Sequence, residues 1–258
     1  MTTFVSHTGR LTAHALRRLS RQPAYLLFNL IQPMVWLLLF GELFRRVAEL
    51  PGFGTGDYLS YLTPGVIVMT AMMSAGWAGT SFIEDMDRGV MDRNLTSPVS
   101  RGALIAGSLA HQSVVTVIQS LIVFGVGLLA GARYDGGVTG VLVVLACAVL
   151  LSIIFGALSD AIALLVRQQE ALIGISQFLA LPLAFLSSVM MAPSLLPSWV
   201  GTVAEYNPVD WAAVAGREAL AAAPDWSRVL GHGGLLLALA AVMSWLATRA
   251  FRAYQRSN

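Results

Sequence analysis

The sequence has 258 residues, of which 56% are hydrophobic and only 12% are charged. An ordinary soluble domain carries roughly 25% charged residues, so this composition excludes a typical soluble fold and favours an integral membrane protein. The sixteen basic residues are all arginines, and there is no lysine. Because a P-loop needs the lysine of its GK[ST] motif to reach the phosphates, any nucleotide hydrolysis that involves this chain takes place on another polypeptide.

The first 22 residues form a separate basic element. Drawn as a helix at about 100° per residue, they place apolar side chains on one side (Phe4, Val5, Leu11, Ala15, Leu16 and Leu19) and basic ones on the other (Arg10, His14, Arg17, Arg18 and Arg21). This pattern predicts an amphipathic helix at residues 1–22 that lies in the inner membrane interface, where anionic headgroups attract it. An unstructured basic tail is the alternative.

Apolar runs of about 20 residues recur along the rest of the chain, and a helix of that length spans a hydrocarbon core of about 30 Å. We predict an all-α integral membrane fold with six transmembrane helices, at residues 26–44, 60–82, 104–130, 138–166, 171–191 and 230–251. No internal repeat or low-complexity linker interrupts this pattern, so residues 23–258 are expected to form one transmembrane domain.

Arginines in short loops predict the orientation, since they are enriched on the cytoplasmic side. With the N-terminus inside, the inner segments hold eleven arginines (10, 17, 18, 21, 88, 93, 101, 167, 249, 252 and 256) and the outer segments hold five (45, 46, 133, 217 and 228). Both termini are therefore expected in the cytoplasm, with the chain in the inner (plasma) membrane. The small net charge of +2 favours contacts with membrane lipids over nucleic-acid binding.

A crowded polar segment, residues 84–102, separates the second and third predicted spans. Its candidate contact residues are Glu84, Asp85, Asp87, Arg88, Gly89, Asp92, Arg93, Leu95, Pro98 and Arg101. The acidic residues at its start suit a helix N-terminus, where negative charge is favourable, and Met86, Val90 and Met91 supply an apolar ridge. A charged and partly apolar segment between two spans indicates a docking surface for a soluble partner.

The outer stretch between the fifth and sixth spans, residues 193–222, predicts two short helices that are broken at Asn207-Pro208. Pro197, Trp199 and Arg217 belong to the same stretch. Because apolar faces on these helices would be costly in water, we expect a re-entrant hairpin that dips into the outer leaflet. A solvent-exposed loop is the alternative.

Neutral polar residues form stripes within three of the spans. The third span carries Ser108, Gln112, Thr116 and Gln119 on one helix face, the second carries Thr70, Ser74 and Trp77, and the first carries Asn29 and Gln32. Such side chains either hold helices together or line a polar pathway. Both interpretations stay open, and the eight of these residues other than Ser108 are the candidate substrate pathway.

Asp160, in the fourth span, is an intramembrane carboxylate and therefore a functional candidate. It is expected to be an inner-end carboxylate that snorkels or pairs with an arginine, with an ion site as the alternative. A catalytic pair with His111 has no recognisable nucleophile beside it, and no metal-ligand spacing occurs. Cys147, the single cysteine, is expected to be a packing residue.

Two motifs give the chain a family resemblance. The cytoplasmic loop reads Arg88-Gly89-Val90, Asp92-Arg93 and Leu95-Thr96-Ser97-Pro98-Val99-Ser100-Arg101, and the outer segment reads Leu195-Leu196-Pro197-Ser198-Trp199, then Asn207-Pro208-Val209 and Arg217. With six spans and a basic N-terminal helix, the chain resembles over essentially its full length the permease subunit of an ABC type-2 exporter. It is most similar to the daunorubicin-resistance type.

The resemblance implies a permease dimer, formed with itself or with a second permease, that binds two copies of a separate cytoplasmic ATPase. ATP and magnesium would bind that partner, and this chain would hold no cofactor. Residues 84–101 would be the coupling helix that contacts the ATPase, and residues 193–222 the outer hairpin. The implied cargo is an amphipathic or lipid-like drug. A polysaccharide or lipid-linked glycan, and an ion-driven secondary transporter that uses Asp160, are the alternatives.

Overall fold

The structure is a computed structural model that describes residues 30–46, 57–88 and 101–256. Within these ranges the regular elements are all helical. The predicted N-terminal helix at 1–22 lies outside the described residues, and so do several candidate site residues: Asn29, Gly89, Asp92, Arg93, Leu95 and Pro98. The side chain of Arg101 is not described either.

Four helices are long and apolar enough to cross a membrane: Tyr58–Asp87, Leu104–Leu129, Gly137–Val166 and Trp226–Phe251. The first of these contains α4 (Tyr58–Gly76) and α5 (Thr80–Asp87). The others belong to α7 (Arg101–Leu129), α8 (Gly137–Val166) and α12 (Trp226–Arg256). The prediction of an all-α membrane fold is therefore confirmed, with the second, third, fourth and sixth predicted spans at the expected places.

The first and fifth predicted spans are shorter apolar helices, Leu30–Leu43 and Gln169–Phe185. The first contains a π-helical stretch, η1 (Trp36–Phe40), followed by α3 (Gly41–Leu43). The second is α9, which ends at Phe185 rather than at the predicted residue 191. The residues after it bend away, and the chain continues through η3 (Pro193–Leu195), α10 (Ser198–Ala204) and α11 (Pro208–Leu220).

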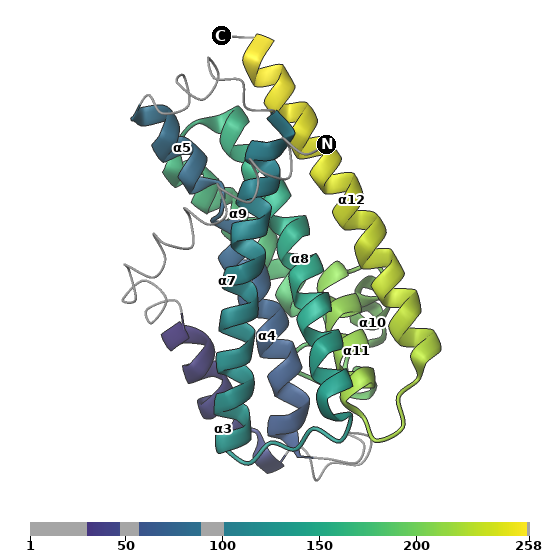
Figure 1. Ribbon diagram of the computed structural model, residues 1–258. Helices are drawn as coiled ribbons and strands as arrows, with labels where there is room; N and C mark the ends of the chain where they lie inside the picture. Colours follow the sequence, from purple (N-terminus) through teal and green to yellow (C-terminus); the bar gives the residue numbers. More distant parts are fainter. Residues whose placement is uncertain (1–29, 47–56, 89–100, 257–258) are drawn as a thin grey trace.

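Helix α8 lies at the centre of the bundle and packs against α4, α7, α11 and α12. Figure 1 shows α5 and the C-terminal end of α12 at one end of the bundle, whereas the α7–α8 and α11–α12 connections lie at the other. Helix α11 lies beside α8 and α12. We call the end of the bundle that contains α5 the α5 end, and the end with the α7–α8 and α11–α12 connections the opposite end.

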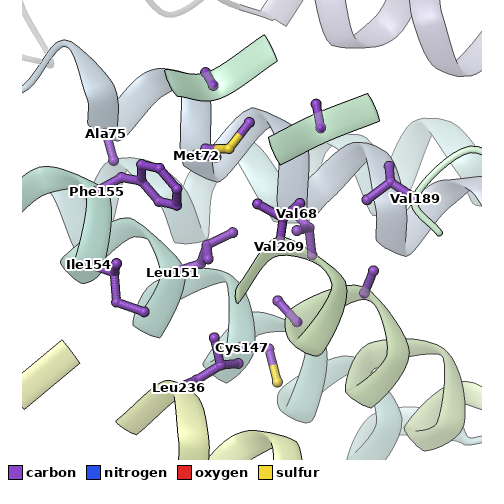
Figure 2. Close-up of a cluster of buried hydrophobic side chains, with 14 of the residues drawn as sticks. Val68, Met72, Ala75, Cys147, Leu151, Ile154, Phe155, Val189, Val209 and Leu236 are labelled. Carbon is purple, nitrogen blue, oxygen red and sulfur yellow. The ribbon is translucent and has the colours of Figure 1, made fainter. Parts of the chain in front are cut away.

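A large apolar cluster joins α4 to α8 and to the segment after α9 (Figure 2). Met72 of α4, Leu151 of α8 and Val209 of α11 are at most 1% exposed within it. Cys147 belongs to the same cluster and is 3% exposed, so its predicted role as a packing residue is confirmed. Burial of apolar side chains between helices contributes packing energy here, because in a membrane close contact replaces the hydrophobic effect between helices.

At the opposite end, α8 and α11 approach closely enough to require glycine. The backbone N–H of Gly136 donates to the carbonyl of Leu220 at 2.9 Å. A Cβ added at Gly136 would lie 2.1 Å from the carbonyl oxygen of Ala219, and one added at Gly140 would lie 2.4 Å from the same atom. These contacts fix the C-terminal end of α11 against the start of α8.

Candidate functional site

A groove of about 370 Å³ lies between the Leu30–Leu43 helix, α4 and α9. Its walls are largely apolar, with Trp36, Met69, Met73 and Phe185 among them. Polar side chains enter it from several helices: Gln32, Thr70, Ser74, Gln119 and Gln177. The lining, as far as the structure describes it, contains no charged side chain.

Five of the eight candidate pathway residues meet in this groove: Gln32, Thr70, Ser74, Trp77 and Gln119. Gln112 and Thr116 are buried on the same face of α7, at 6% and 1% exposed. The Nε2 of Gln112 donates to Ser74 Oγ at 3.1 Å. Gln112 thus holds α7 to α4, whereas Thr116 Oγ1 and Gln119 Oε1 have no hydrogen-bond partner among the described residues. The stripe on α7 therefore contains both Gln112, which links two helices, and Gln119, which lines the groove without a hydrogen-bond partner among the described residues.

The predicted second span is interrupted between Gly76 and Thr80. In this break the backbone bonds are of the i→i+3 type, with Thr80 N–H donating to Trp77 at 3.1 Å. The carbonyl of Gly76 instead accepts hydrogen bonds from Ser159 Oγ at 2.6 Å and from Ser176 Oγ at 2.8 Å. These two hydroxyls, on α8 and α9, bind the carbonyl that would otherwise continue the helix, so the span predicted at 60–82 contains a break that the sequence analysis did not predict.

The break is also held by its second glycine. The N–H of Gly79 donates to Ser159 Oγ at 3.0 Å, so one hydroxyl bonds both sides of the break. A Cβ at Gly79 would lie 2.4 Å from the Ser159 carbonyl oxygen. The break is therefore fastened to α8 through short polar contacts, and α5 starts directly beyond it.

Helix α5 contains the described part of the predicted docking segment, through Arg88. Phe82 and Ile83 are buried in a cluster with residues of α7, α8 and α12, and Met86 packs partly against it. Met86 was predicted to form part of an apolar ridge facing a partner, but part of its surface is used within the chain. Glu84 and Arg88 form a surface ion pair at 3.5 Å, and Asp87 is exposed. Asp85 is half-buried.

The predicted outer segment has the expected helix, break, helix order. Asn207 precedes α11, where its Oδ1 accepts from Val209 N–H at 3.0 Å and so caps the helix, and Pro208 is the first helical residue. Pro197 precedes α10 and Trp199, within it, is 61% exposed. The Nδ2 of Asn207 donates to the carbonyls of Leu183 and Leu186 at 2.7 and 2.8 Å, which fastens the end of α9 to the start of α11.

Arg217 of α11 binds two distant segments. Its Nε donates to the carbonyl of Tyr61 at 3.2 Å, and its two terminal nitrogens donate to Ser188 Oγ at 3.1 Å and to the Val189 carbonyl at 2.6 Å. The guanidinium also lies 3.7 Å from the centroid of the Tyr61 ring. Arg217 thereby ties α4 and α11 to the non-helical residues after α9.

Two further residues complete this network. Tyr61 Oη donates to the carbonyl of Ser188 at 2.8 Å, and Tyr58 Oη donates to that of Met190 at 2.9 Å. Asp210 Oδ1 accepts from the N–H of Ser188 at 2.6 Å. Sequence reasoning identified Arg217 but not Tyr58, Tyr61 or Asp210. The available signal was that a positively charged group in an apolar segment needs acceptors or acids nearby.

A second cavity, of about 970 Å³, lies at the opposite end. Its described lining includes acidic and basic side chains together: Glu42, Arg45, Asp57, Arg133, Asp135 and Arg217. Because positive and negative side chains both line this cavity, its charge does not favour either an anionic or a cationic ligand.

Asp160 is fully buried where α8 meets α7. Its Oδ1 accepts a long hydrogen bond of 3.4 Å from Ser108 Oγ, and its Oδ2 has no hydrogen-bond partner among the described residues. The expectation that this carboxylate snorkels or pairs with an arginine was therefore wrong, because α7 covers it. No group of histidine, cysteine or carboxylate side chains with metal-binding geometry occurs in the ranges that the structure describes.

These features define an all-helical membrane protein with a weakly polar groove and a polar helical extension at one end. The chain belongs to the ABC-2 type transporter family, whose model matches residues 7–220. It is 30% identical over 261 residues to the daunorubicin resistance ABC transporter permease protein DrrB1 of Streptomyces coeruleorubidus, an alignment that covers 99% of this chain and 88% of that relative.

Other relatives have the same kind of description. The chain is 21% identical over 228 residues to the probable doxorubicin resistance ABC transporter permease protein DrrC of Mycobacterium tuberculosis, covering 88% of this chain and 82% of that one. It is 28% identical over 209 residues to the putative transport permease ycf38 of Cyanophora paradoxa, covering 81% and 72%. The chain is accordingly a transport permease subunit.

Proposed function

We propose that this permease exports an amphipathic, drug-like compound, driven by ATP hydrolysis on a separate subunit. The observation that carries this proposal is that α4 and α7 serve two regions at once. They flank the predicted coupling segment at residues 84–101, and they also supply Met69, Ser74 and Gln119 to the groove. Movement of the segment would therefore displace two groove-lining helices together. The drug resistance names of two relatives support the class of cargo.

The partners follow from the same assignment. Two copies of a cytoplasmic ATPase, which bind ATP and magnesium, contact residues 84–101 of a permease dimer. The exposed carboxylate of Asp87 and the neighbouring Glu84–Arg88 pair give α5 a polar tip suited to a soluble partner. The dimer is formed with a second copy or with a related permease, and no nucleic acid takes part.

We further propose that the two shorter helices, Leu30–Leu43 and α9, complete six crossings of the inner (plasma) membrane. The α5 end is cytoplasmic in this topology, and both termini lie there. The position of Arg88, Arg167 and Arg249 toward this end supports the orientation, because arginines in short segments are enriched on the cytoplasmic side.

The α10–α11 hairpin is proposed to re-enter the outer leaflet. A non-helical segment at membrane depth is tolerated only where the surrounding protein satisfies its backbone groups. The residues after α9 meet this condition, since side chains of Asn207, Asp210 and Arg217 bond backbone groups between Leu183 and Val189. A loop in water would not need these side chains to bond its backbone groups, because water would bond them.

The central test is to reverse charges in the coupling segment of the full permease, coexpressed with its ATPase. Asp92→Arg and Arg93→Asp should abolish transport-linked ATP hydrolysis while leaving membrane insertion unchanged, because an interface of few residues depends on each close contact. Asp135→Arg, a reversal at the opposite end, is the matched control and should retain activity. Normal export by either coupling variant would contradict the proposal.

A further inference from the structure

Gln119 gives the groove a buried polar atom that has no hydrogen-bond partner in the part of the chain that the structure describes. Gln119 projects from α7 into the groove, is 2% exposed, and its Oε1 has no hydrogen-bond partner among the described residues. A buried amide oxygen without a partner is unfavourable. Such a group persists where something else binds it for part of the time.

Two neighbours of Gln119 on this face of α7 and α4 have hydrogen-bond partners within the protein, and Thr116, whose Oγ1 is also without a partner among the described residues, does not line the groove. Gln112, two turns away, donates to Ser74 Oγ at 3.1 Å. Thr70 Oγ1 donates to the carbonyl of Val66 at 2.7 Å. These two residues contribute to packing between and within helices, whereas Gln119 lines the groove with a buried side-chain oxygen that has no hydrogen-bond partner among the described residues. Gln119 therefore differs from Gln112 and Thr70 in having a buried hydrogen-bond acceptor without a partner among the described residues.

The rest of the groove indicates the body of the ligand. Trp36, Trp77, Phe185 and the methionines Met69 and Met73 supply flat and deformable apolar surface. Gln32 and Gln177 add further neutral amides from two other walls. An uncharged amide offers N–H donors and an acceptor oxygen, so it recognises hydroxyl, amine and carbonyl groups but does not neutralise a phosphate.

We infer that Gln119 is a specificity-determining residue whose side-chain oxygen accepts a hydrogen bond from a hydroxyl or amine on a rigid, apolar ligand in this groove. The inference rests on the proposed export function and narrows its cargo. A lipid-linked glycan carries an anionic phosphate, and the described lining offers that phosphate no arginine. The groove chemistry thus separates the drug-like cargo from the glycan alternative.

The test uses the full permease with its ATPase in lipid nanodiscs. The probes are daunorubicin, which is fluorescent and carries hydroxyl and amine donors, and a fluorescent lipid phosphate. The variants are Gln119→Met, which keeps the length of the side chain but removes the acceptor, and Gln112→Met as the matched control on the same helix face. Binding is measured by fluorescence titration, and the Tm of each variant is measured without ligand.

The expected result is that Gln119→Met weakens daunorubicin binding by roughly 3- to 10-fold, the effect of one lost hydrogen bond, and leaves the Tm unchanged or raised. Gln112→Met should lower the Tm, because its bond to Ser74 is lost, and should leave daunorubicin affinity within about 2-fold of the original. A purely structural role for Gln119 would give the reverse pattern, with a lowered Tm and unchanged affinity.

Three results would overturn the inference: equal daunorubicin affinity in the original protein and Gln119→Met, no saturable daunorubicin binding by the original protein, or saturable binding of the lipid phosphate alone. ATP hydrolysis in the same nanodiscs separates this failure from failure of the proposed function. If the complex hydrolyses ATP and the Asp92→Arg variant does not, the exporter assignment holds even when the role of Gln119 is rejected.

Discussion

The hydroxyl of Ser159 donates a 2.6 Å hydrogen bond to the carbonyl oxygen of Gly76, across the place where α4 stops. Because Ser159 Oγ also accepts a hydrogen bond from the N–H of Gly79, a single α8 side chain holds both sides of the break. The proposed coupling segment, residues 84–101, begins within α5, which starts directly beyond the break. Under the proposed function, motion of that segment would reach α4 through a joint that α8 anchors, and Gly79 and Ser159 of this joint are not among the residues that line the groove.

Gly79→Ala should loosen this joint. The added Cβ would lie 2.4 Å from the Ser159 carbonyl oxygen, which forces the backbones apart at an expected cost of about 1–3 kcal/mol. Thermal unfolding in nanodiscs measures the loss. The control is Gly174→Ala on α9. A Cβ added at Gly174 would meet no neighbouring atom within 4 Å, so alanine should be neutral or stabilising there. Equal effects of the two substitutions would exclude a special role for the break.

Arg217→Lys should destabilise the outer segment although the charge is kept. A lysine ammonium cannot reproduce the planar fork that reaches Tyr61, Ser188 and Val189. Buried acceptors left without a donor cost about 1–3 kcal/mol each, so a loss of at least about 2 kcal/mol is expected. Hydrogen exchange of the amides at 186–192 reports it locally.

Arg228→Lys is the control for that experiment. Arg228 pairs with Glu218 at 3.1 Å on the surface, where its side chain is 62% exposed. Surface ion pairs contribute at most about 1 kcal/mol, so this change should leave both stability and exchange rates nearly unaltered. Similar protection losses in the two variants would show that charge alone, rather than the guanidinium geometry, holds the segment.

Asn207 should not tolerate replacement by aspartate. Asn207→Ala removes a helix cap and two donors, with an expected loss of about 1–3 kcal/mol. Asn207→Asp restores the cap oxygen but places a second oxygen against the carbonyls of Leu183 and Leu186, so it should be at least as harmful as alanine. The Tm values of both variants give the comparison. Rescue by aspartate would mean that the cap, and not the bridge to α9, is the important contact.

Asp160→Asn should leave ATP-driven export intact. The carboxyl group is fully buried beside Ser108, and asparagine fills the same space with an oxygen that still accepts the bond. An ion-driven transporter would depend on the charge of this group instead. Uptake of the cargo into inverted vesicles supplied with ATP, after the proton gradient has been collapsed, distinguishes the two. Loss of ATP-driven export in the variant would make Asp160 functional.

Much of the fold followed from hydrophobic length alone. The helix at 138–166 was predicted within one residue of α8, because an apolar run bounded by Gly136-Gly137 and by Arg167 has clear limits. The order of α10, the Asn207-Pro208 break and α11 also followed from local signals. Such elements are determined by residues adjacent in the chain.

The features that sequence reasoning missed depend on distant residues. Gly76 and Gly79 alone do not predict a break, because glycine also occurs inside apolar helices. The break is held by the hydroxyls of Ser159 and Ser176, which lie 83 and 100 residues after Gly76 in the chain. The bond from Arg217 to Tyr61 spans 156 residues. The burial of Asp160 depends on where α7 lies. Periodicity within one segment contains no information about which second segment will face it.

The buried position of Cys147 has a practical consequence for measuring conformational change in this permease. A thiol that is 3% exposed in the packed interior is poorly accessible to maleimide reagents. Two new cysteines, one near the joint and one at the opposite end of the bundle, could therefore be labelled with spectroscopic reporters without first removing Cys147. Changes in the distance between the reporters during turnover would then be measured on a chain that is otherwise unaltered.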